Sequence, residues 1–205
     1  MQIKAVIIKK IISGFLAYFI FVTHAHAHHP MGGITPTNML DGLLSGLGHP
    51  IIGLDHLAFI LAVSLIVAVM KLPIKIPLFF AIASTIGVLG QIIGLEIPAV
   101  ENAILLSILV VGAALVRGKN IASSKVAVVI TLFGLFHGYA FGEAIIGAEP
   151  TPIISYLVGL AMVELLIIYS LIFTIRAVGL IASDLASRLA GASVAGVGVL
   201  LILIS

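Results

Sequence analysis

The sequence predicts an all-α membrane protein, a polytopic bundle of about six transmembrane helices that follows an N-terminal signal peptide. Hydrophobic residues make up 61% of the 205 residues and charged residues only 9%, whereas about 25% charged residues is usual for soluble domains. Six apolar runs approach the length of about 20 residues that a transmembrane helix needs. The high hydrophobic content makes the lipid bilayer the expected partner. Because the net charge is only +2, we expect no binding of nucleic acid.

Residues 1–27 are typical of a signal peptide. Three lysines among the first ten residues form a basic start, and the apolar stretch from Ile11 to Val22 is too short to span a bilayer. Small residues then offer two cleavage positions, after Ala25 or after Ala27. An uncleaved membrane anchor is the alternative.

The rest of the chain divides into an external N-terminal segment, residues 28–48, and a six-helix membrane domain, residues 49–205. The external segment has mixed polarity, and we expect it to lie near the membrane surface. Residues 177–188 either extend the fifth helix or lie along the inner surface. The predicted spans are Pro50–Met70, Ile76–Leu95, Asn102–Val116, Val126–Gly147, Ile153–Ile175 and Leu189–Ser205.

The charges between the spans predict the orientation. Basic loops follow the first, third and fifth spans, and the loops between them are acidic. By the positive-inside rule, the basic loops lie in the cytoplasm and the mature N-terminus lies outside the bacterial inner membrane. The basic residues are Lys71, Lys75, Arg117, Lys119, Lys125, Arg176 and Arg188, and the acidic loops contain Glu96, Glu101 and Glu149.

Two groups of ionisable residues interrupt the apolar runs. The first contains His49, Asp55 and His56, and the second contains His137 and Glu143. A charged side chain at the bilayer centre costs roughly 2.5–3.5 kcal/mol even on lenient scales, so these groups must be offset by pairing, water or a ligand. We therefore expect the functional site there.

The spacing within the first group leaves two arrangements open. On a straight helix His49 and His56 are about 10 Å apart, which is too far for one ion with bonds near 2.1 Å. Either Pro50 and Gly53 distort the start of the helix, or the residues form successive stations along an inward path. Stations are the favoured reading, with His49 at the mouth. The deeper site then comprises Asp55, His56 and His137.

The side-chain chemistry favours a divalent transition-metal ion as the cargo. Imidazole and carboxylate suit such ions, and the absence of cysteine disfavours Cu(I) and excludes thiolate sites. Asp55 either binds the ion or orients His56. Further candidates for the ion path are Glu164, Gln91, His28 and His29, although Glu164 is equally compatible with a hydrogen bond between helices.

Glycines recur every fourth residue on one face of the fourth span, at Gly134, Gly138 and Gly142. Small residues at this spacing let helices approach closely. The same glycines also clear space beside His137. We therefore predict a close helix contact at this face.

The two polar groups resemble the motifs of the HupE/UreJ family of nickel and cobalt permeases. His49-x5-Asp55-His56 is similar to the first motif, and Phe136-His137-Gly138-x-Ala140-x-Gly142 is similar to the second. In that second motif a histidine often follows the alanine, and the glutamate comes two residues after the glycine. Here Phe141 takes the first place and Glu143 follows Gly142 directly. One residue turns a helical side chain by about 100°, so Glu143 departs from the family pattern.

The resemblance implies a permease that captures Ni²⁺, or in second place Co²⁺, and passes it to the cytoplasm. It also implies a link to a metallochaperone or to hydrogenase or urease maturation. We expect no prosthetic group and no enzymatic activity, and a homo-oligomer is compatible with the sequence. The alternatives are an intramembrane metal-dependent enzyme and a proton-linked carrier that binds no metal.

Overall fold

The computed structural model describes residues 34–118, 121–179, 181 and 183–204, and every regular element in this part of the chain is a helix. This confirms the predicted fold class. The predicted signal peptide and the candidates His28 and His29 lie outside the described residues. The helices are α2 (Met39–Ile52), α3 (Leu54–Val69), α4 (Ile76–Ile92), α5 (Val100–Arg117), α6 (Ser123–Phe141), the short 3₁₀ helix η1 (Gly142–Ile145), α7 (Pro150–Val178) and α8 (Asp184–Ile204).

The helices correspond in order to the six predicted spans. Four described segments are long and apolar enough to cross a membrane, namely α5, α6 with η1, α7 and α8. The pair α2 and α3 forms a fifth if it is one span with a 77° bend, and α4 is a shorter apolar helix of 17 residues. The boundaries around residues 177–188 differ from the predicted spans: α7 extends to Val178, and α8 already begins at Asp184.

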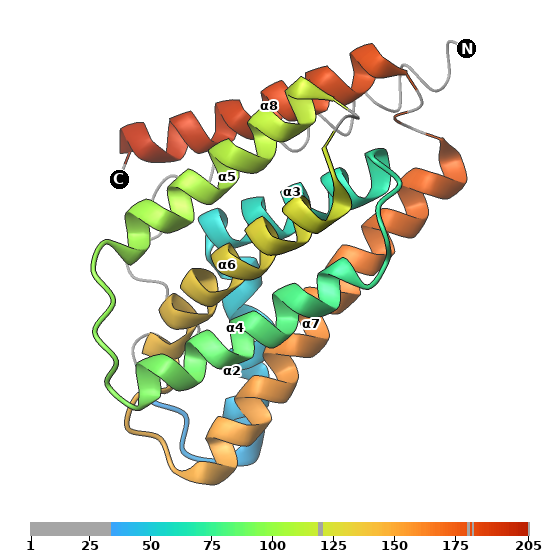
Figure 1. The fold of residues 1–205 in the computed structure, drawn as a ribbon. Coiled ribbons are helices and arrows are strands. Elements are labelled where there is room, and N and C mark those ends of the chain that lie inside the picture. The colour runs from blue at the N-terminus through green and yellow to red at the C-terminus, as the bar shows by residue number, and fades with distance from the viewer. Residues whose placement is uncertain (1–33, 119–120, 180, 182, 205) are drawn as a thin grey trace.

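The first helix begins at Met39 rather than at the predicted Pro50, because glycines let α2 pack directly on α7. A Cβ atom at Gly46 would overlap the carbonyl oxygen of Tyr156, and one at Gly159 would lie 2.5 Å from that of Leu43. Residues 39–48 are thus a helix held against α7. Figure 1 shows α2 lying along α7 on one side of the bundle, with α5 and α8 side by side on the other.

Helix α3 forms the centre of the bundle. It is flanked by α2, α5, α7 and α8, and the side chains of Phe59, Ile60 and Val63 are inaccessible to solvent. The glycine face of α6 makes the close helix contact that the sequence predicts. Its partner is α4, and Gly138 lies against the backbone of Ser84.

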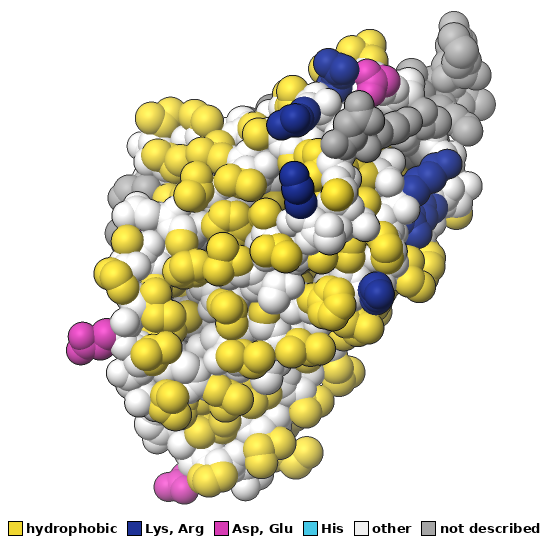
Figure 2. Space-filling view, in the orientation of Figure 1, with side chains coloured by type: hydrophobic (Ala, Val, Ile, Leu, Met, Phe, Trp, Pro, Cys, Tyr) yellow, Lys and Arg dark blue, Asp and Glu magenta, His cyan; other side chains and the backbone are white. Residues whose placement is uncertain are grey.

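Many large apolar side chains are exposed on the outer surface of the bundle, as Figure 2 shows for one face. Such a surface suits lipid rather than water.

Charged side chains lie at the two ends of the bundle. Lys and Arg side chains gather towards one end of the face in Figure 2, and acidic side chains project at the other. We call these the basic end and the acidic end. Among the described residues, the basic end holds Lys71, Lys75, Arg117, Lys125, Arg176 and Arg188, and the acidic end holds Glu96, Glu101, Glu143 and Glu149.

Candidate metal-binding site

A break at Gly53 brings His49 close to His56. Helix α2 runs through Pro50 and ends at Ile52, and α3 continues from Leu54 at an angle of 77°. The ring centroids of His49 and His56 are 5.9 Å apart, whereas a straight helix would separate the two residues by about 10 Å. The distortion that the sequence left open is therefore present, and the favoured arrangement of successive stations stays a prediction.

His137 of α6 joins His56 in the interior of the bundle. Their Nδ1 atoms are 2.9 Å apart, and Ser107 Oγ of α5 lies 3.0 Å from His137 Nε2. The His137 ring stacks on Phe59, with centroids 4.3 Å apart and planes inclined by 14°. His49, His56 and His137 are each at most 2% exposed. We call these three residues the histidine cluster.

The hydroxyl of Tyr156 fixes the orientation of His49. Tyr156 Oη donates a hydrogen bond to the carbonyl oxygen of Phe141 at 2.6 Å, and His49 Nδ1 lies 3.0 Å from the same Oη. Because a phenol has one proton to donate, His49 Nδ1–H must donate to Oη. The proton of a neutral His49 is therefore on Nδ1, and its Nε2 is unprotonated.

The same reasoning assigns the protons of the other two histidines. Ser107 Oγ donates to the carbonyl oxygen of Ile104, so His137 Nε2–H donates to Ser107. In a neutral His137, Nδ1 then accepts the hydrogen bond from His56 Nδ1–H. His56 Nε2 is thus unprotonated, and an unprotonated imidazole nitrogen is the form that binds a metal ion.

Asp55 supports the backbone at the start of α3. Its Oδ1 accepts a hydrogen bond from the backbone N–H of His56 at 2.8 Å, and its side chain is half-buried. A carboxylate in the first turn of a helix interacts favourably with the helix dipole. Asp55 therefore both places negative charge beside the cluster and orients the segment that holds His56.

Gly53 is required by the position of the His56 ring rather than by its own backbone angles. Its φ of −72° is open to any residue, but an added Cβ would lie 2.6 Å from His56 Cδ2. We expect Gly53→Ala to displace the His56 ring and to lower metal affinity by about tenfold or more, as changes around metal ligands typically do. Metal binding to the purified chain and its level in membranes test this. A variant with unchanged affinity would show that the ring position is unimportant.

Three candidates from the sequence stay outside the cluster. Glu143 is exposed in η1, and Gln91 is half-buried where α4 packs on Gly142. Glu164 of α7 is buried and accepts a hydrogen bond from Ser84 Oγ at 2.8 Å. The structure thus brings together His49, Asp55, His56 and His137, but not these three.

The cluster must adjust its side chains to hold an ion. No three His, Asp or Glu side chains in the described part of the chain already have the arrangement of a metal site. Two imidazole nitrogens bonded to one ion at about 2.1 Å lie roughly 3.0–3.4 Å apart in common geometries. The 2.9 Å between His56 Nδ1 and His137 Nδ1 is close to this distance. For an ion to replace their shared hydrogen bond, the rings must rotate slightly and the proton of His56 must move from Nδ1 to Nε2.

Sequence reasoning missed three polar residues around the cluster. Tyr156 and Ser107 are single polar residues in apolar runs, and nothing in the local sequence connects them to the motifs. Ser45 precedes His49 by four residues and therefore lies on the same face of α2. This spacing could have identified Ser45 from the sequence as a residue near the cluster. Ser45 Oγ is buried and has no hydrogen-bond partner, which leaves a polar atom one helical turn from His49.

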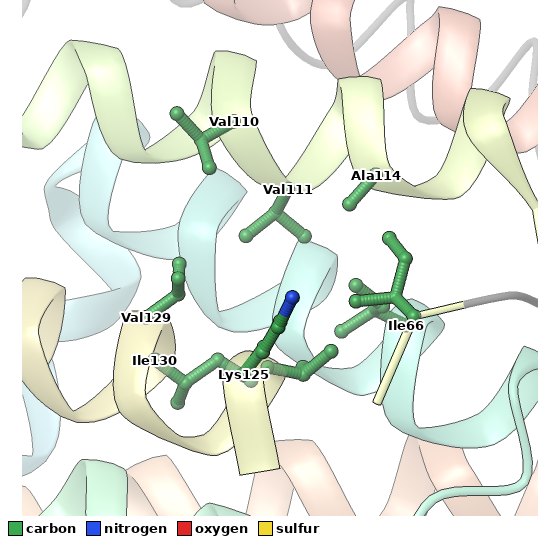
Figure 3. Close-up of a pocket in the computed structure, with 9 residues that line it drawn as sticks. Ile66, Val110, Val111, Ala114, Lys125, Val129 and Ile130 are labelled. Carbon is green, nitrogen blue, oxygen red and sulfur yellow. The ribbon is translucent and has the colours of Figure 1, made fainter. Parts of the chain in front are cut away.

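A cavity of about 190 Å³ lies between the three helices that hold His56, Ser107 and His137. Its lining is apolar except for Lys125, whose nitrogen points into the cavity in Figure 3. Val111 follows Ser107 by about one helical turn, and Ile130 precedes His137 by about two. The cavity therefore lies on the side of the cluster that faces the basic end. The lining residues are Ile66, Val110, Val111, Ala114, Ile121, Lys125, Val126, Val129 and Ile130.

Comparison with known proteins identifies a family of metal transporters. The model of the family described as HupE / UreJ protein, a family of nickel and cobalt transporters rather than of enzymes, matches residues 16–201. Protein HupE from Rhizobium leguminosarum bv. viciae is 32% identical over 120 residues, which cover 58% of this chain and 59% of that protein. The chain thus matches about three fifths of the length of this relative. No solved structure matches the chain.

Proposed function

The chain belongs to the HupE/UreJ family, and from this premise we propose that it is a permease for divalent transition-metal ions, with Ni²⁺ the preferred cargo and Co²⁺ the second. In this proposal the basic end faces the cytoplasm of a bacterium and the acidic end faces outward, in agreement with the positive-inside rule. The ion is captured at the histidine cluster and released inward. Partners in metal delivery to hydrogenase or urease belong to the same proposal.

The observation that carries this proposal is the convergence of three buried histidines from three separate helices. His56 and His137 are 81 positions apart in the sequence, yet their rings are hydrogen-bonded. Buried polar groups in a membrane domain are rare and mark functional sites. Three imidazoles and the carboxylate of Asp55 form a ligand set that suits Ni²⁺ and Co²⁺.

The residues of the cluster have different roles in the proposed path. His56 and His137 form the central pair, and His49 lies nearer the acidic end, held by Tyr156. Glu143 is exposed at that end and adds negative charge that attracts cations. The cavity towards the basic end offers no ligand to a bare ion, so an ion that leaves the cluster there must regain its water shell.

Uptake into proteoliposomes tests the proposal directly. We expect vesicles that contain the full chain to accumulate radiolabelled Ni²⁺ faster than empty vesicles, and excess Co²⁺ to compete more effectively than Mg²⁺, because imidazole ligands discriminate against hard cations. Accumulation no faster than in empty vesicles would overturn the proposal. Equal competition by Mg²⁺ would overturn the role of the histidines.

A further inference from the structure

Glu164 is a buried carboxyl group that the proposed metal site does not use. It lies in the middle of α7, and its side chain is inaccessible to solvent. Oε1 accepts the hydrogen bond from Ser84 Oγ, whereas Oε2 is buried without a hydrogen-bond partner. Within the described ranges, the one ion pair of a Lys or Arg with a carboxylate joins Arg188 and Asp184. No such cation compensates Glu164.

These surroundings determine the protonation state of Glu164. An isolated ionised carboxylate away from water is very unfavourable, and a buried group in this position instead keeps its proton. A single hydroxyl donor does not offset a full negative charge. Glu164 is therefore a neutral carboxylic acid in this structure, with the unpartnered Oε2 as the atom that bears the proton.

The ionisable groups on the elements packed against α7 lie mostly towards the acidic end. Helix α4 contributes none within its bounds. Tyr156 lies about 12 Å from Glu164 along α7. Arg176 points to the far end of α3, where Nη2 donates to the carbonyl oxygens of Val67 and Leu72. The other groups are Asp41 and His49 of α2, Asp55 and His56 of α3, Glu143 of η1 and Tyr169 of α7.

The hydrogen-bond partner of Glu164 is in contact with the helix that holds His137. The backbone of Ser84 contacts Gly138, which follows His137. A divalent ion bound to neutral imidazoles brings two positive charges, of which the Asp55 carboxylate compensates one. The remaining positive charge acts over a long distance in a medium of low dielectric constant, so it favours the ionised form of Glu164.

We propose that Glu164 is a proton-exchange site that compensates the charge of the transported ion. When a divalent ion with its remaining water ligands enters the histidine cluster, the O–H bond of Glu164 breaks, water that accompanies the ion accepts the proton and the carboxylate remains. When the ion leaves, Glu164 takes up a proton again. This inference rests on the proposed permease function. It implies that Glu164 releases one proton when an ion binds and takes up one proton when the ion leaves.

Proton release on metal binding tests the inference with the purified full chain in detergent. At about pH 8 ordinary histidines are already neutral, so their contribution to proton release is small. We expect NiCl₂ to release about one proton more per bound ion from the wild type than from Glu164→Gln, which keeps the shape but cannot ionise. Glu149→Gln, which removes an exposed carboxylate at the start of α7, serves as the matched control and should behave as the wild type.

Each outcome of this experiment has a defined meaning. Equal proton release by the wild type and Glu164→Gln overturns the inference while the permease function stands, provided that both bind Ni²⁺. Absence of Ni²⁺ binding to the wild type overturns both. A second measurement uses the wild type alone and so does not depend on correct folding of the variant. NiCl₂ should abolish the infrared carbonyl band of a protonated carboxylic acid. A band that persists in the metal-bound protein contradicts the inference.

Discussion

We expect His137→Ala to abolish Ni²⁺ uptake while the protein remains in the membrane. His137 is fully buried, faces His56 at 2.9 Å and stacks on Phe59. Its removal takes away one of the two central ligands and leaves His56 Nδ1–H without its acceptor. Uptake should fall to the level of empty vesicles, and His56→Ala should have the same effect. Substantial uptake by either variant would contradict the proposed central pair.

A pair of buried serines separates loss of the site from general damage to the core. Ser107 and Ser64 are both inaccessible to solvent, and both donate to a carbonyl oxygen of their own helix, but only Ser107 also binds His137. Ser107→Ala should reduce uptake by about tenfold, because it frees the tautomer and ring of His137. Ser64→Ala should leave uptake unchanged. Equal effects of the two changes would point to packing rather than to the ligand.

The sequence was sufficient to predict the helical class and the residues of the cluster, because both depend on local chemistry. Apolar runs of about 20 residues indicate spans by length alone. Histidine and aspartate within such runs are so unfavourable that they mark a site. The motif residues His49, Asp55, His56 and His137 therefore stood out before any fold was known.

The sequence raised a distortion at Pro50 and Gly53 as one of two alternatives, but it did not decide between them or locate the bend at Gly53. Pro50 was an equally good candidate for a break but sits within α2. Helix α2 was not predicted over residues 39–48 either, because Gly42, Gly46 and Gly48 lower intrinsic helix propensity by up to about 1 kcal/mol each. Gly42 and Gly46 are favourable only where α7 provides a surface for close packing. Tyr156 was missed for the same reason, since its role depends on that contact.

We expect Gly138→Ala to destabilise the bundle and to abolish uptake, although it adds only one methyl group. The new Cβ would overlap the carbonyl oxygen of Ser84, with Ser84 C and Cα 2.5 Å away. These are backbone atoms of α4 that cannot turn aside, so the two helices must separate. Such overpacking typically costs about 1–3 kcal/mol and occasionally more. The separation also displaces His137, the neighbouring residue, and the hydrogen bond from Ser84 to Glu164.

The matched control is Gly196→Ala in α8, where nothing lies within 4 Å of the added Cβ. Alanine is the better helix former by up to about 1 kcal/mol, so this change should leave stability unchanged or raise it slightly. Thermal unfolding in detergent and Ni²⁺ uptake should be measured for both variants. A Gly138→Ala protein as stable and active as Gly196→Ala would show that α4 and α6 can separate without loss of the site. The opposite result would show that the close contact of these helices holds both the histidine cluster and Glu164 in position.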